Sequence, residues 1–152
     1  MIDYVIGKII TSAIKSIQSI NDPKLIEKEL SLYISKLKDK LQLTKNILFR
    51  NEPVEFYENY IPVTLESNKS IYRIGKAADF IEIIEKAIIL GKAGSGKTTL
   101  MRFLTLSSIY QSIFYLPILI ELRGFDPELE NFENYVASCI SSTEKESVIS
   151  LF

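Results

Sequence analysis

The stretch "IILGKAGSGKTTL", from Ile88 to Leu100, constrains the fold of this chain more than any other segment. It holds an apolar run, then three closely spaced glycines, then a lysine and two threonines. The apolar run Ala87 to Leu90 lacks polar alternation, which is typical of a strand buried on both faces. From Lys97 onward, the apolar residues recur at helical spacing. The order of strand, glycine loop and helix predicts the beginning of an α/β domain with a parallel sheet.

The glycine loop matches the pattern G-x-x-x-x-G-K-[ST] between Gly91 and Thr98. A compact polyphosphate is best held by many backbone N–H groups on a tight curve, and such a curve favours residues that lack a Cβ atom. The helix that follows directs its unpaired N–H groups and the positive end of its dipole at the same point. We therefore predict a nucleotide-binding site made of Gly91, Gly94, Ser95, Gly96, Lys97, Thr98 and Thr99.

Within this site, which would bind ATP or ADP, we expect Lys97 to lie against the β and γ phosphates as a point charge. The Thr98 hydroxyl is the predicted ligand of Mg²⁺, and Thr99 can reach the α phosphate. The loop recognises phosphates, so it leaves adenine and guanine undistinguished. A glycine turn that merely caps a helix is the alternative interpretation.

Composition excludes several classes of function. The 18 basic and 19 acidic residues nearly cancel, so an electrostatic grip on nucleic acid or on an anionic membrane is not expected. The chain has no histidine, which removes imidazole mechanisms, and its single cysteine excludes a disulfide framework. We expect Cys139 to be a buried structural thiol, and we assign no catalytic residue.

Residues 1–50 predict an all-α unit. An isoleucine stripe runs through the first twenty residues, and Pro23 fits the first turn of a second helix. These two helices are expected to pack as an antiparallel hairpin, with a third, shorter helical piece from Leu41 to Arg50. The first stretch is too interrupted by charge for a signal peptide or a membrane span, which favours the cytoplasm. The second helix should bury Leu25, Ile26, Leu30, Tyr33, Ile34, Leu37 and Leu41.

Residues 51–86 predict a connector with short strands and a helix. Pro53 and Pro62 oppose helix, "ESNKS" predicts a turn, and "KAADFIEIIEKA" returns to helical spacing. Residues 87–152 then predict a partial P-loop domain. It would add a second strand from Leu116 to Leu122 and a surface helix in "LENFENYVASCISS", with Leu129, Phe132, Tyr135, Val136, Cys139 and Ile140 facing inward.

"GKAGSGKTTLMRFL" followed by "LPILIELRGF" resembles the NACHT branch of the STAND signalling ATPases, which occurs in bacterial defence proteins. "LFRNEPVEFYENYIPVTL" is similar to the connector between a helical N-terminal domain and the NACHT module. The resemblance is strongest from Leu48 to Phe125. It implies an ATP-binding switch of antiviral defence, with the predicted loop as its nucleotide cradle. Arg123 falls on an arginine common after the second strand, where a role in nucleotide sensing and a structural salt bridge are both open.

The family continues with an apolar strand that ends in acidic residues, the Walker B element, which holds Mg²⁺ and orients the attacking water. "SSTEKESVISLF" ends the chain where that strand should begin. In the family's sheet, further strands also lie between the two strands predicted here. We therefore expect the N-terminal part of a longer protein, or a truncated product of one, that does not turn over ATP appreciably by itself.

Two functions of different classes follow. The first is a nucleotide-dependent switch, in which ATP or ADP reorders the helical unit against the P-loop unit. The second is a non-enzymatic interaction module, in which the N-terminal helices self-associate or recruit an effector protein and the loop is vestigial. A small-molecule kinase or a GTPase ranks third.

Overall fold

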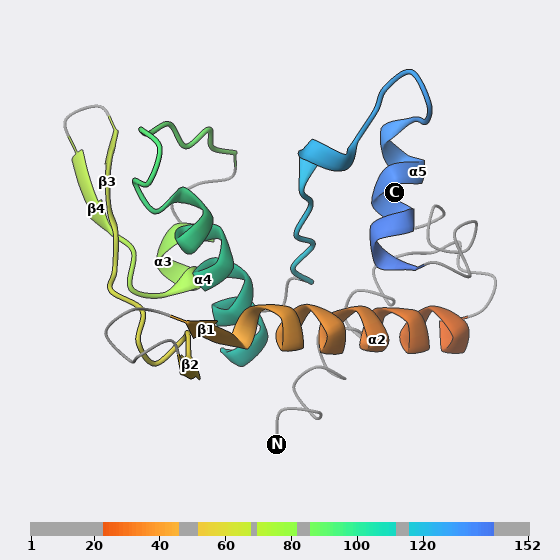
Figure 1. Ribbon diagram of the computed structural model, residues 1–152, viewed down its shortest axis with the longest axis horizontal. Coiled ribbons are helices and arrows are strands. Elements are labelled where there is room, and N and C mark those ends of the chain that lie inside the picture. Colours follow the sequence, from red (N-terminus) through yellow and green to blue (C-terminus); the bar gives the residue numbers. More distant parts are fainter. Residues whose placement is uncertain (1–22, 46–51, 68–69, 82–85, 112–115, 142–152) are drawn as a thin grey trace.

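The computed structural model describes residues 23–45, 52–67, 70–81, 86–111 and 116–141. They form a mixed α/β arrangement of helices and two small antiparallel sheets. The long helix α2 (Pro23–Gln42) runs along one side, and α4 (Lys97–Tyr110) and α5 (Phe132–Ile140) stand against it (Figure 1). The predicted mixed class is thus confirmed. The predicted first helix and its hairpin with the second lie outside the described residues.

Helix α2 begins at the predicted Pro23 and buries the predicted apolar face, except that Leu25 is only half-buried. Its residues recur at steps of three and four, so they form one stripe that packs against α4 and α5. This stripe is the largest contribution of one element to the core. The buried residues are Ile26, Leu30, Tyr33, Ile34, Leu37 and Leu41.

The helical piece predicted from Leu41 to Arg50 is wrong where the structure describes it. Helix α2 ends at Gln42, and β1 (Leu43–Lys45) pairs antiparallel with β2 (Pro53–Glu55), Thr44 opposite Val54. Residues 46–50 lie outside the described part. The physical reason is pairing across the chain: the backbone of β1 finds a ladder partner in the connector, which outweighs local helical spacing.

The short strands predicted in the connector are confirmed, and two of them form a small hairpin. Strands β3 (Thr64–Ser67) and β4 (Ser70–Arg73) pair antiparallel, with Leu65 opposite Tyr72. Helix α3 (Ala77–Ile81) follows and packs against α4. Its first residue is fully buried, and the Ala77 N–H donates to the buried Ser107 Oγ at 3.1 Å. The connector therefore wraps around the helix that follows the glycine loop.

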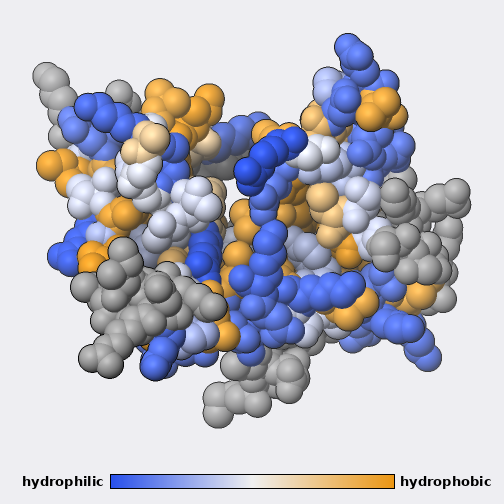
Figure 2. Space-filling view, in the orientation of Figure 1, coloured by the Kyte–Doolittle hydropathy of each residue, from blue (hydrophilic) through white to orange (hydrophobic). Residues whose placement is uncertain are grey.

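The parallel sheet is not formed by the residues that the structure describes. Residues 87–90 and 116–121 run as irregular segments outside any sheet, and residues 122–124 form the short 3-10 helix η2 (Leu122–Gly124). A parallel strand needs a neighbour for its ladder, and none is present in the described ranges. Ile88 is 89% exposed and Leu90 87% exposed. Figure 2 shows that apolar patches are scattered among polar surface on the face in view.

The predicted surface helix is confirmed as α5, which Asn131 caps by accepting from the Asn134 N–H at 2.8 Å. Val136 and Ile140 face inward as predicted. Leu129, Phe132 and Cys139 are exposed instead, so the expectation of a buried thiol is wrong. Leu129 precedes α5, and Phe132 and Cys139 line open pockets beside the helix, so each of these side chains reaches solvent.

Candidate functional site

The glycine loop adopts the tight curve that its sequence predicts. Gly94 has φ of +75° and Gly96 has φ of +87°, both in the left-handed region that side chains disfavour. The Ser95 N–H, between them, donates to the Lys92 carbonyl at 3.2 Å. Helix α4 then begins at Lys97, as predicted. The loop amides therefore belong neither to a helix nor to a strand.

Gly91 serves the loop in a different way from the other two glycines. A Cβ atom placed on Gly91 would lie 2.5 Å from Ser95 Oγ, closer than such atoms approach one another in proteins. The Ser95 side chain therefore closes over the backbone at Gly91. The crowding atom at Gly91 is the end of an exposed side chain that can turn away, whereas Gly94 and Gly96 are favoured by their backbone angles.

Lys97 folds back over the loop that precedes it. Its ammonium donates to the carbonyls of Gly91 at 2.6 Å and Lys92 at 2.8 Å, and to Ser95 Oγ at 3.3 Å. No carboxylate of the described residues forms an ion pair with it. The charge is thus held by neutral oxygens that take up its three N–H donors, so an anion at the loop would have to draw the ammonium away from them.

The start of α4 offers N–H groups to the same point. Gly96 is the N-cap, and no side chain of the described residues caps this end of the helix. The first turn of a helix leaves its N–H groups without intrahelical partners, so a phosphate there would find donors and the positive end of the dipole. Thr98 and Thr99 are exposed in this first turn.

The described residues offer few protein ligands for Mg²⁺. The described residues contain no group of three or more acidic, cysteine or histidine side chains able to hold a metal ion. Thr98 is therefore the only residue that our prediction provides for Mg²⁺, and phosphate oxygens and water would have to supply the other ligands. That arrangement suits Mg²⁺, which keeps several waters and binds through few protein groups.

Arg102 links the glycine-loop helix to the end of α2, a role that sequence reasoning missed. Its Nε donates to the Leu41 carbonyl at 2.6 Å and its Nη2 to the Leu43 carbonyl at 2.5 Å. The guanidinium also lies 4.1 Å from the centre of the Phe56 ring. Arg102 thus satisfies one carbonyl at the end of α2, which lacks an intrahelical partner, and one at the start of β1. A lone arginine in a helix gives no sequence signal for such a contact.

Stacked aromatic rings hold the connector on the same helix. Tyr60 lies nearly parallel to Phe103, with ring centres 3.7 Å apart, and Tyr57 stacks on Phe103 at 5.6 Å. Val63, three residues after Tyr60, lies close to Gly96, since a Cβ there would be 3.5 Å from its Cγ1. The aromatic spacing of "FYENY" is the signal that could have indicated this packing.

Arg123 lies away from these contacts. It is in η2, and its Nη2 is 3.3 Å from Glu121 Oε2, a residue that Lys40 of α2 also contacts at 2.8 Å. Among the described residues no hydrogen bond or ion pair joins Arg123 to the glycine loop. Of its two open roles, the salt bridge has the geometric support.

No protein-family model, no curated protein and no solved structure matches the chain. Within the described residues, no helix is both long and apolar enough to cross a membrane.

Proposed function

We propose that this chain is the nucleotide-binding N-terminal portion of a NACHT-like signalling switch, and that it binds ATP or ADP through Gly91 to Thr99. The observation that carries the proposal is the placement of one ammonium within a loop of two left-handed glycines. Lys97 contacts the Gly91 and Lys92 carbonyls, and the uncapped start of α4 adjoins it. Backbone donors and a single counter-charge are what a polyphosphate tail requires.

The switch has a route from the loop to the helical unit. Helix α4 carries Lys97 in its first turn and Arg102 in its second, and Arg102 contacts the carboxyl end of α2. A ligand shifts an equilibrium only if it contacts one state better than the other. In this proposal the γ phosphate provides that difference by drawing Lys97 from the loop carbonyls, so that α4 moves with respect to α2.

Binding can be tested with a fluorescent ATP analogue titrated into the full chain, with and without Mg²⁺. We expect micromolar affinity, about −8 kcal/mol, and its loss in Lys97→Ala. Lys92→Ala is the matched control, because it removes an equal charge from the same loop while keeping the carbonyl that contacts Lys97. If both variants weakened binding equally, the nucleotide would be attracted only by the overall positive charge of the loop, and the proposal would be contradicted.

A non-enzymatic interaction module is the second candidate. The exposure of Ile88 and Leu90 favours it, because apolar side chains beside the loop can contact another protein. Absence of nucleotide binding, with the helical circular dichroism signal intact, would support this module. In that case we expect self-association or binding of an effector protein.

A further inference from the structure

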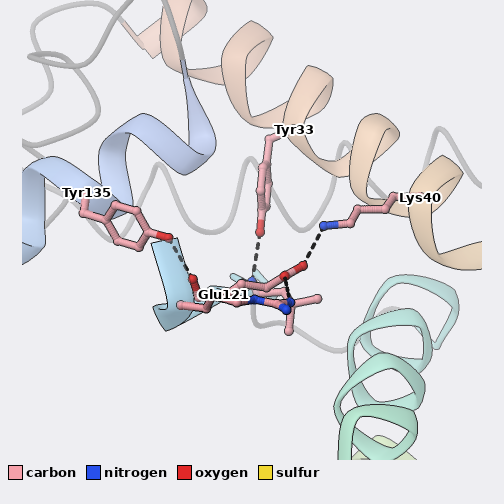
Figure 3. Close-up of polar contacts among 6 residues, drawn as sticks. Tyr33, Lys40, Glu121 and Tyr135 are labelled. Atoms are coloured by element: carbon pink, nitrogen blue, oxygen red, sulfur yellow. Dashed lines mark hydrogen bonds and ion pairs between the residues drawn. The ribbon is translucent and has the colours of Figure 1, made fainter. Parts of the chain in front are cut away.

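A cleft lies where α2 faces α5 and the segment between them, apart from the glycine loop. Its volume is about 470 Å³, within the range of small-molecule sites. Leu37 of α2 and Leu119 supply apolar lining, and the rings of Tyr33 and Tyr135 close two sides (Figure 3). The exposed Cys139 lies at its edge. The cleft can therefore take a ligand with an apolar body.

Two phenol groups are fixed at this cleft. The Tyr33 hydroxyl accepts from the Leu119 N–H at 2.9 Å, so its own hydrogen remains to be donated. Burial raises the pKa of Tyr33, which keeps that hydrogen in place at neutral pH. The Tyr135 hydroxyl donates to the Glu121 carbonyl at 2.8 Å, and this hydrogen bond fixes the backbone of Glu121 beside α5. The cleft thus presents a donor on a rigid support.

The charges around the cleft do not balance. Lys36, Lys40 and Arg123 line it, and Glu121 is the one acidic residue among the lining residues. Glu121 contacts Lys40 at 2.8 Å and Arg123 at 3.3 Å, whereas the Lys36 ammonium has no ion pair with the residues that the structure describes. Lys36 and Lys40 are one helical turn apart, where like charges repel. An anion would relieve this repulsion.

The carboxylate contact is one that a ligand can replace. The side chains of Lys40 and Glu121 are 64% and 52% exposed, so water competes for their ion pair and the pair is easily opened. An incoming carboxylate or phosphate can then draw on Lys36 and Tyr33 without breaking any strong contact. Lys40 and Arg123 need only turn from Glu121 toward it.

We propose that this cleft binds a small organic anion, with its carboxylate or phosphate at Lys36 and Lys40 and its apolar body against Leu37 and Leu119. The ligand class is set by the combination of excess positive charge, a phenol donor and an apolar lining. The site is separate from the proposed nucleotide site and does not depend on it. A ligand there would contact α2, segment 119–124 and α5 together, so its binding would also stabilise the packing of these elements.

The test titrates the full chain with phenyl phosphate and with phenylacetate, measured by ligand-observed NMR. Benzyl alcohol and phenylacetamide are the neutral controls, and inorganic phosphate tests the charge alone. We expect at least one anion to bind more tightly than its neutral control. Lys36→Gln should weaken that binding about fivefold, while Lys28→Gln, on an exposed part of α2 outside the cleft, should leave it unchanged.

Glu121→Gln provides the sharper outcome. It removes the carboxylate that competes for Lys40 and Arg123, so anion binding should tighten by about fivefold although a native contact is lost. Weaker binding in Glu121→Gln, equal binding of anions and neutral controls, or indifference to Lys36→Gln would overturn the proposal. Loss of anion binding in Lys97→Ala would also overturn it, by assigning the anion to the glycine loop. Binding of the ATP analogue should be unchanged in Lys36→Gln.

Discussion

Arg102 donates from Nε to the carbonyl of Leu41 at 2.6 Å, and so joins the helix after the glycine loop to the last turn of α2. The contact is made to the backbone of α2. It therefore depends on where α2 ends more than on which side chains stand there. Burial lowers the pKa of the guanidinium, but arginine stays charged in proteins, so the hydrogen bonds remain charge-assisted.

Arg102→Met should destabilise the chain by about 2 kcal/mol, because two carbonyls lose a charged donor and the Phe56 ring loses its cation. The measurement is the urea midpoint. Arg102→Lys should recover only part of the loss, since one ammonium cannot donate in the geometry of a planar fork. Full recovery with lysine would show that charge alone matters at this position.

Gly91→Ala should destabilise the chain by less than about 1 kcal/mol, because the new Cβ would lie 2.5 Å from Ser95 Oγ and this exposed side chain would have to turn away. The double variant Gly91→Ala/Ser95→Ala removes that oxygen and should regain most of the stability in urea unfolding. Gly94→Ala is the control, since its cost comes from a φ of +75° with open space around it. If Ser95→Ala also rescued Gly94→Ala, crowding would not be the cause at Gly91.

Phe103→Ala should cost about 3 to 5 kcal/mol, because Phe103 is 3% exposed and stacks with both Tyr57 and Tyr60. Tyr60→Phe keeps the ring and loses only the hydroxyl that accepts from the Val63 N–H at 3.3 Å. Its cost should stay below about 1 kcal/mol. A larger effect of Tyr60→Phe than of Phe103→Ala in urea unfolding would contradict stacking as the main attachment of the connector.

Acid should weaken the contact of Glu121 with α2. The hydrogen bond and charge of Lys40, and then Arg123, lower the pKa of Glu121 below its ordinary value of 4.5. A lowered pKa in the folded chain means that the contribution to stability is present above pH 4.5 and is lost as pH falls through the lowered value. The urea midpoints of the original chain and Glu121→Gln should therefore differ at pH 7 and converge in acid. A constant difference down to pH 3 would exclude this linkage.

Local patterns were enough to predict part of the fold. The apolar spacing of α2, the start of α4 at Lys97 and the turn of the β3–β4 hairpin each follow from neighbours in the sequence. The left-handed backbone at Gly94 and Gly96 also follows from the sequence, because glycine is the residue that adopts a positive φ without a steric cost. These features depend on steric effects between neighbouring residues and on burial of one helix face, and both can be inferred from a single sequence.

Long-range contacts were not predictable in the same way. β1 replaced an expected helical piece because it pairs with β2, and residues 87–90 form no strand where no ladder partner is present in the described ranges. The hydrogen bond from Arg102 to Leu41 joins positions 61 residues apart. The cleft near Glu121 is lined by side chains from three segments of the chain. Cys139 shows the same limit, since helical spacing placed it inward while the neighbours of α5 leave it exposed.

Helix α4 spans Lys97 to Tyr110, so its ends lie about 20 Å apart. The chain contains no tryptophan, and Tyr110 packs against Tyr57 at the end remote from the loop. Tyr110→Trp would therefore introduce a single indole, whose emission can be excited apart from that of the remaining tyrosines. A shift in the emission wavelength on adding nucleotide would mean that the whole helix moves as a rigid unit. An unchanged wavelength would mean that only the glycine loop responds.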